Sequence, residues 1–152
     1  MRLWHYQLIS VLPRQQLIAQ WRECCCIAKL IAYNKTPNHL LVNRIMDYPA
    51  YDFMHYCYLI KQEIRRRGYS VSTASWITLD ENLMLAEDLG YFAEDGKYDP
   101  DILFQGWMND RYLRQCYFNL QEKYDCGAIS EDEWMKIENL IDISGKMMYY
   151  YW

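Results

Sequence analysis

An arginine and a glutamate stand side by side in the stretch LPRQQLIAQWRECCC, residues 12–26. A carboxylate such as Glu23 can transfer protons or stabilise a developing positive charge. The guanidinium of Arg22 can bind a phosphate through two parallel hydrogen bonds. Such a pair on a helix is more often a solvated surface pair, so the dipeptide by itself leaves both interpretations open.

Three cysteines follow directly, at positions 24–26. Consecutive helical side chains point about 100° apart, so these three cannot all bind one metal ion. The sequence also contains no Cys-x-x-Cys pair that would support a zinc site. We therefore expect one or two of these cysteines to pack in the core, and we expect no metal or other cofactor. With no visible secretory signal, six free cysteines indicate a reducing, cytoplasmic environment.

Helices must position these residues, because helical spacing dominates the chain and strand patterns are nearly absent. The spacing predicts a helix over residues 13–31, opened by a proline and ended by the segment NKTPNH. A short helix is expected from Asn38. A longer one runs from Pro49 to Gly68, where glycine suits a left-handed helix end.

Three consecutive arginines, residues 65–67, fall in the last turn of that longer helix. Cations there interact favourably with the helix dipole, which explains them as a solvated helix end. Contact with phosphate is the alternative.

The sequence pattern predicts less regular structure directly after that helix. Residues 69–79 are polar and β-branched, which predicts a loop or a short extended segment. Asp80 is then expected to cap a short helix that runs through Leu89.

Two further helices are expected near the C-terminus. One runs from about residue 100 to residue 124 and is closed by Gly127. The stretch SEDEW, residues 130–134, predicts a capping box at the start of the other, which ends near Gly145. The aromatic tail KMMYYYW follows, either docked on the core or exposed as a contact surface.

The length of 152 residues suits one domain, and 52% hydrophobic residues can build a real core. No run of 18 apolar residues is present, so no membrane span is expected. The net charge of −4 hides an asymmetry: residues 1–70 carry ten basic and four acidic residues, and residues 71–152 carry six and sixteen. The basic half could face phosphate; a simple dipolar protein is the alternative.

The pattern L-x-S-x-L-x-x-Q-x-L-x-A-x-x-R-E over residues 8–23, a few residues from the initiator Met, resembles the pyrimidine-dimer DNA glycosylases of the phage endonuclease V type. LIKQEIRRRGY, residues 59–69, is similar to the second long helix of that family. YLRQCYFNLQEKYDCGAIS, residues 112–130, looks like a feature of a bacterial and phage branch. The resemblance is good over residues 1–70.

The resemblance implies an all-α fold of three main helices plus short helices, with the N-terminus between helices, here as a single domain over residues 1–152. It implies a DNA glycosylase acting on double-stranded DNA that removes a damaged or modified base, such as a pyrimidine dimer. The N-terminal amine attacks the sugar C1′ and forms an imine, and β-elimination, the AP-lyase step, then cuts the strand. No metal or cofactor is implied, and we expect a monomer.

The resemblance also assigns roles to individual residues. Met1 supplies the amine, whose ordinary pKa of about 7.7–8.0 leaves a useful neutral fraction. Glu23 handles protons and stabilises the cationic sugar. His5 serves as a proton carrier or orients Glu23, with a structural histidine as the alternative. The expected substrate contacts are Arg2, Arg14, Gln15, Arg22, Lys123 and Tyr124.

Three features depart from the family pattern. Position 2 is Arg rather than a small residue, so the free amine is that of Met1, and Arg2 stands in for a phosphate-binding arginine. Cys26 occupies a position where many members have another arginine. The segment around Lys123 and Tyr124 is acidic rather than basic. Two alternatives therefore stay open: a non-catalytic module of the same fold that binds nucleic acid or protein, and an N-glycosidase acting on nucleotides or RNA.

Overall fold

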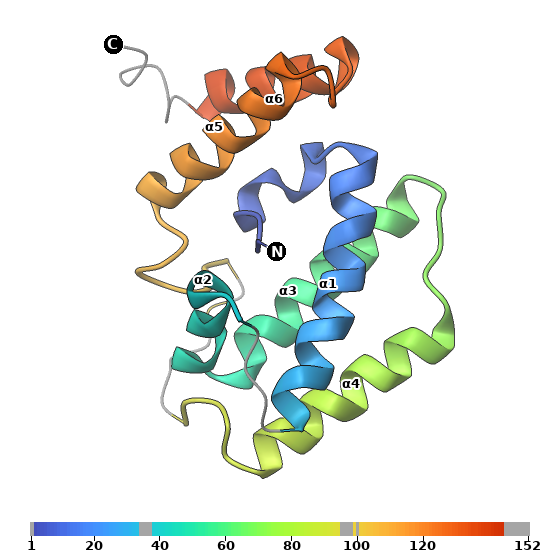
Figure 1. The fold of residues 1–152 in the computed structure, drawn as a ribbon, viewed down its shortest axis with the longest axis vertical. Helices are drawn as coiled ribbons and strands as arrows, with labels where there is room; N and C mark the ends of the chain where they lie inside the picture. Colours follow the sequence, from blue (N-terminus) through green and yellow to red (C-terminus); the bar gives the residue numbers. More distant parts are fainter. Residues whose placement is uncertain (1, 34–37, 95–98, 100, 145–152) are drawn as a thin grey trace.

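The computed structural model describes residues 2–33, 38–94, 99 and 101–144, with side chains as far as Ile141. The all-α prediction is confirmed, because every regular element of the described residues is helical (Figure 1). In chain order, the elements are η1 (Tyr6–Val11), α1 (Arg14–Ala32), α2 (Leu40–Asn43), η2 (Arg44–Asp47), α3 (Ala50–Arg66), α4 (Thr73–Asp88), α5 (Asp110–Asp125) and α6 (Glu131–Ser144).

The long helices form two groups. Helices α1, α3 and α4 pack together at one side of the molecule, and α5 and α6 pack as a pair at its other end (Figure 1). The first described residues and η1 run between α1 and α5 (Figure 1). This arrangement places the beginning of the chain among helices, as the resemblance implies.

Helix α1 buries the face that its sequence predicts. Apolar residues recur along it every three or four positions and are at most 7% exposed: Leu17, Trp21, Cys24, Ala28 and Ile31. This spacing forms one stripe along a helix, and burying the stripe is the main source of stability for such a helix. The Trp21 ring stacks on Trp76 of α4, with ring centroids 6.1 Å apart.

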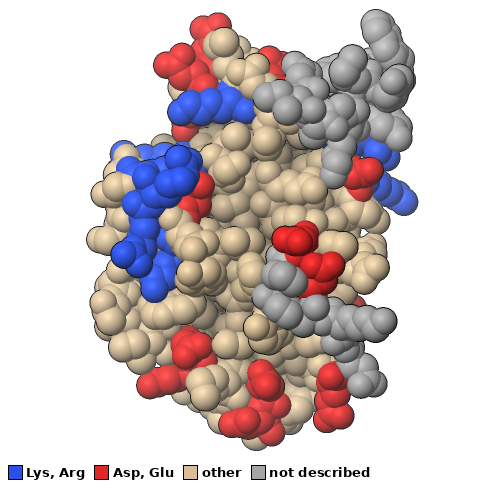
Figure 2. All heavy atoms as spheres, turned by 180° about the vertical axis from the view of Figure 1, so that it is seen from behind, with Lys and Arg blue, Asp and Glu red and all other residues tan. Residues whose placement is uncertain are grey.

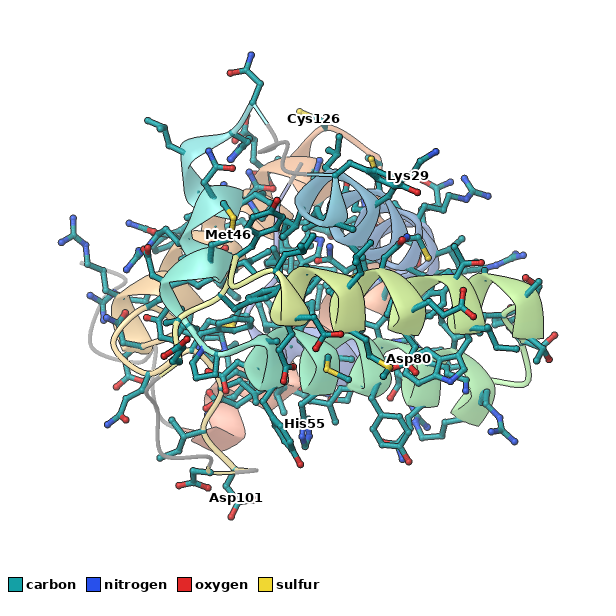
Figure 3. The ribbon with its side chains drawn as sticks, turned by 90° about the horizontal axis from the view of Figure 1, so that it is seen from below. Lys29, Met46, His55, Asp80, Asp101 and Cys126 are labelled. Carbon is teal, nitrogen blue, oxygen red and sulfur yellow. The ribbon has the colours of Figure 1, made fainter. Side chains whose placement is uncertain are left out.

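The short helix predicted from Asp80 through Leu89 is longer than expected at its start. Helix α4 begins at Thr73, inside the segment predicted as a loop, so that prediction is wrong. The Ser72 hydroxyl caps it by accepting from the Ser75 N–H at 3.0 Å. Asp80 is not a cap, because it lies in the middle of α4 (Figure 3). Tertiary packing against α1 overrides the weak β-propensity of these residues.

The helix predicted from residue 100 begins ten residues later, at Asp110. Asn109 caps it, with its side-chain oxygen accepting from the Tyr112 N–H at 3.0 Å. The preceding segment is irregular, and Phe104 adopts a positive φ of 52°, which is incompatible with a continuous helix. The end was correctly predicted, because α5 stops at Asp125 and Gly127 has a φ of 82°.

The arginine cluster is more structural than predicted. The guanidinium of Arg67 donates to the Leu12 carbonyl at 2.7 Å and to the Ser10 carbonyl at 3.2 Å. It also pairs with the buried Glu63 at 2.8 Å. Arg67 therefore binds the end of η1, whereas Arg65 is exposed, as a solvated helix end requires.

The capping box at the start of α6 is confirmed. The Ser130 hydroxyl accepts from the Glu133 N–H at 3.2 Å and donates to the Glu133 carboxylate at 3.0 Å. The second carboxylate oxygen of Glu133 accepts from the Arg14 N–H at 3.0 Å. One carboxylate thus satisfies backbone or cap groups at the starts of both α1 and α6, and ties these helices together.

Two expectations fall outside the described residues: the helix end near Gly145 and the placement of the KMMYYYW tail. Within the described segments, none of the helices has both the length and the apolar character needed to cross a bilayer.

Replacing Glu133 with Gln should lower the free energy of unfolding by about 1 kcal/mol at neutral pH, because a cap shared by two helices is weakened. Burial acts to raise the pKa of Glu133. Hydrogen bonds from Arg14 and Ser130 together outweigh it, so the pKa is lowered in the folded protein. The carboxylate therefore stabilises the fold above the ordinary glutamate pKa, and this contribution is lost as pH falls through the lowered pKa.

Urea unfolding at neutral and acidic pH measures this difference. Glu131→Gln is the matched control, since Glu131 is exposed in the same helical turn. Equal losses in the two variants, or a Glu133→Gln loss that does not shrink towards low pH, would contradict the shared cap.

Candidate functional site

The first residues of the chain are held through their backbone by helix α1. The Arg2 N–H donates to the Glu23 carboxylate at 3.4 Å, and the Trp4 N–H donates to the Gln20 side-chain oxygen at 2.9 Å. Gln20 and Glu23 are three positions apart on α1, so their side chains are neighbours on one helix face. Helix α1 therefore provides two acceptors for an extended segment that runs beside it.

The same segment is held from other helices. The Tyr56 hydroxyl of α3 lies 2.7 Å from the Trp4 carbonyl oxygen. The Tyr112 hydroxyl of α5 donates to the Leu3 carbonyl. Since Leu3 and Trp4 are buried, these backbone groups have no access to bulk water and need protein partners. Residues 2–4 thus have one fixed path through the interior.

Gln20 connects this path to Glu23. The residue is 1% exposed, its side-chain oxygen accepts from the Trp4 N–H, and its side-chain nitrogen donates to the Glu23 carboxylate at 3.3 Å. Glu23 itself is half-buried and receives hydrogen bonds from both Arg2 and Gln20. The carboxylate is therefore oriented towards the start of the chain.

Sequence reasoning missed Gln20, Tyr56 and Tyr112. Gln20 carried a signal, because it is a polar residue on the apolar face of α1, three residues before Glu23. The two tyrosines carried none, since tyrosines are abundant in this sequence and only the fold brings these two to the segment.

Met1 lies outside the described residues. Arg2 is its covalent neighbour, and the Arg2 N–H is the group that donates to Glu23. The structure therefore places the Arg2 nitrogen beside Glu23, and the position of the Met1 amine stays a prediction.

The Arg2 side chain is half-buried and faces α5. Its guanidinium carbon lies 5.7 Å from the centroid of the Trp4 ring. Burial raises the pKa of the Tyr112 hydroxyl and of the Cys116 thiol, while the neighbouring Arg2 charge acts to lower both. The cation therefore lies close to both groups, deeper than a surface arginine.

His5 has both ring nitrogens engaged. It is 2% exposed, and its Nδ1 accepts from the Gln7 N–H at 3.1 Å at the start of η1. The proton of the neutral ring is then on Nε2, which donates to the Met108 carbonyl at 2.9 Å. This arrangement favours the structural alternative for His5 over a proton carrier.

Three of the expected substrate contacts lie together. Arg14, Gln15 and Arg22 line one hollow of about 500 Å³ on the outer side of α1, next to Glu133. All three side chains are exposed, and the Arg14 guanidinium lies 4.8 Å from the centroid of the Tyr69 ring. Glu23 does not line this hollow, although Arg22 directly precedes it on α1.

Lys123 and Tyr124 lie elsewhere, in the last turns of α5. The Tyr124 ring stacks on Trp134 of α6, with centroids 5.2 Å apart and an angle of 11° between the planes. Neither residue lines the hollow of Arg14 and Arg22. Their position in the structure supports packing of α5 against α6 at least as well as contact with a substrate.

The three adjacent cysteines point in three directions, as predicted. Cys24 is buried, Cys25 is half-buried and Cys26 is exposed. Burial raises the pKa of the Cys25 thiol to about 11, so it is protonated at neutral pH. In the described parts of the chain, no three side chains of His, Cys, Asp or Glu are grouped so that they could hold a metal ion.

No curated protein and no solved structure matches the chain. A family model described as pyrimidine dimer DNA glycosylase matches residues 1–77, which are 77 of the 152 residues. The match includes the anchored N-terminal segment, all of α1 with Gln20 and Glu23, and α3 with Tyr56. The family is one of DNA repair glycosylases, whose substrate is DNA. On this match, which spans half of its length and the whole candidate site on α1, the chain belongs to the pyrimidine dimer DNA glycosylase family.

Proposed function

We propose that residues 1–152 form one glycosylase domain that removes a pyrimidine-dimer-like base from double-stranded DNA, with the Met1 amine as nucleophile. The hydrogen bond from the Arg2 N–H to the Glu23 carboxylate carries this proposal. It directs the acid towards the beginning of the chain, which the reaction requires. The proposed domain acts as a monomer and without a metal or cofactor.

The first chemical step is an attack by the neutral amine of Met1 on the sugar C1′. A nitrogen–carbon bond forms, the bond from C1′ to the base breaks, and the departing base takes up a proton. A neutral α-amine is available near pH 8 because its pKa is far below that of lysine. The Glu23 carboxylate stabilises the positive charge that develops on the sugar.

The second step is strand cleavage from the resulting imine. The amine loses a proton and O4′ takes one up as the bond between C1′ and O4′ breaks, which leaves an iminium that acidifies the C2′ hydrogen. Glu23 removes that proton, and the 3′-phosphate leaves by β-elimination. Water then hydrolyses the imine and regenerates the amine.

Phosphate binding is assigned chiefly to the hollow on α1. Arg22, Arg14 and Gln15 are exposed there, and guanidinium groups bind phosphates with charge-assisted hydrogen bonds. Arg2 is half-buried beside Tyr112, so we assign it a phosphate close to the reacting sugar. Such contacts offset the few kcal/mol needed to extrude a nucleotide from the duplex.

Glu23→Gln should abolish the borohydride-trapped adduct with a duplex containing a thymine dimer, or slow its formation by roughly 10²–10⁴-fold. The amide keeps the shape of the side chain, but it cannot take up a proton, and it stabilises a cation less than the carboxylate does. Gel analysis of single-turnover trapping measures the rate. Glu81→Gln, an exposed acid on α4, should trap at the wild-type rate.

A Glu23→Gln protein that traps as fast as the wild type would refute the role of Glu23. If the wild type binds a lesion-bearing duplex tightly but never forms an adduct with it, the non-catalytic module is favoured.

The adduct should map to the N-terminal peptide. Acetylation converts the Met1 amine into an amide, whose nitrogen is not nucleophilic. Acetylation should therefore eliminate trapping and leave duplex binding intact. Mass spectrometry of the proteolysed adduct locates the link. A link to any lysine side chain would contradict the assignment of Met1.

Gln20→Met should slow the chemical step by about tenfold without changing duplex affinity, because it removes the amide that orients Glu23 and Trp4. Loss of the donor to Glu23 should appear in the single-turnover trapping rate and not in the dissociation constant of the duplex. Gln115→Met, at an exposed position of α5, is the control. An equal rate loss in Gln115→Met, or a weaker duplex affinity with an unchanged trapping rate, would contradict the positioning role of Gln20.

A further inference from the structure

A second concave surface lies between η1 and the exposed face of α3. It is a groove of about 680 Å³, and Ile9 and Leu59 provide apolar lining while Tyr6 and Tyr58 add aromatic rings. Neither Glu23 nor Arg22 lines it. The groove is thus separate from the candidate site on α1.

The α3 side of the groove carries an excess of positive charge. Lys61, Arg65 and Arg66 line it at helical spacing. The one acid among the lining residues, Glu63, is buried and already paired with Arg66 at 2.5 Å and with Arg67 at 2.8 Å. Figure 2 shows Lys and Arg gathered along one edge of the face on which α3 lies.

Arg65 is the cation most available to a ligand. Its side chain is exposed, and the described residues give it neither an ion-pair nor a hydrogen-bond partner. Lys61 lies one helical turn earlier, with its ammonium 4.2 Å from the centroid of the Trp76 ring. Two cations of this kind suit a phosphate monoester or diester.

Tyr58 lies one turn before Lys61 and offers a flat ring. Tyr58 is 44% exposed as a residue, and the Gln62 amide donates to its hydroxyl at 2.8 Å, which restrains the orientation of the ring. An exposed aromatic ring beside cations is the usual arrangement for stacking a nucleobase whose phosphate is bound nearby.

Acidic residues that do not line the groove lie near Tyr6. Burial raises the pKa of Tyr6, and the charges of Asp99, Asp101 and Asp110 raise it further. These carboxylates repel a phosphate, so a bound phosphate belongs at the Arg65 end. The volume suits one or two nucleotides and is too small for a duplex.

We propose that this groove is a second nucleotide-binding site, in which Arg65 and Lys61 bind a phosphate and Tyr58 stacks a base. The bound group is either a nucleotide within a single strand or a free nucleotide. The site uses no residue of the proposed glycosylase centre and does not depend on that activity.

Calorimetric titration with 5′-phosphorylated tetrathymidylate and with thymidine monophosphate tests the proposal. The titrations use the Arg22→Glu protein, so that the hollow on α1 does not contribute. Adding Arg65→Glu or Tyr58→Ala should each weaken binding by about fivefold or more. Arg65→Glu should also reduce the slope of log affinity against log salt by about 0.7.

Arg111→Glu is the matched control, since Arg111 is exposed on α5 and outside the groove. It should change affinity by less than about twofold. Tighter binding of the tetranucleotide would identify a strand as the occupant, and equal binding of the two probes would identify a nucleotide.

Equal losses for Arg65→Glu and Arg111→Glu, or no loss for Arg65→Glu, would overturn the proposal. Tetraglutamate bound as tightly as the tetranucleotide would overturn the nucleotide assignment in favour of an acidic peptide. Trapping of a dimer-containing duplex by the Arg65→Glu protein reports separately on the glycosylase centre, so the two proposals can fail independently.

Discussion

Burial of the first few residues is the constraint on which the rest of the site depends. The backbone N–H and C=O groups of a buried segment cannot reach solvent, so each needs a hydrogen-bond partner in the protein. Here α1, α3 and α5 each contribute a side chain to that requirement: Gln20, Tyr56 and Tyr112. An orphaned group at this depth would cost about 1–3 kcal/mol, and the three contacts therefore favour one path for the segment.

That path explains how a surface helix can present a working carboxylate. Glu23 lies at the edge of the apolar stripe of α1, where a glutamate would ordinarily extend into water. Hydrogen bonds from Arg2 and Gln20 instead turn it towards the beginning of the chain. Glu133 holds the start of α1, because its carboxylate accepts a hydrogen bond from the Arg14 N–H. It also lines the hollow of Arg14 and Arg22. The position of the acid is thus a consequence of folding rather than of the dipeptide sequence.

The sequence predicted what local patterns determine. The stripe on α1, the glycine ends after α3 and α5, and the Ser130–Glu133 box all follow from short-range rules. The first half of helix α4 was missed because its β-branched start is stabilised by packing on α1, which no local pattern reveals. Glu23 was found through its offset from the chain start, whereas Tyr56 and Tyr112 are 52 and 109 residues from their backbone partners.

The ionisation of the Met1 amine tests the central claim most directly. Its pKa can be followed by NMR of the ¹³C-dimethylated α-amine in the wild type and in Glu23→Gln. If the chain start lies beside Glu23, the carboxylate stabilises the ammonium, and removing its charge should lower the amine pKa. The same pKa in both proteins would place the amine away from Glu23 and contradict the account.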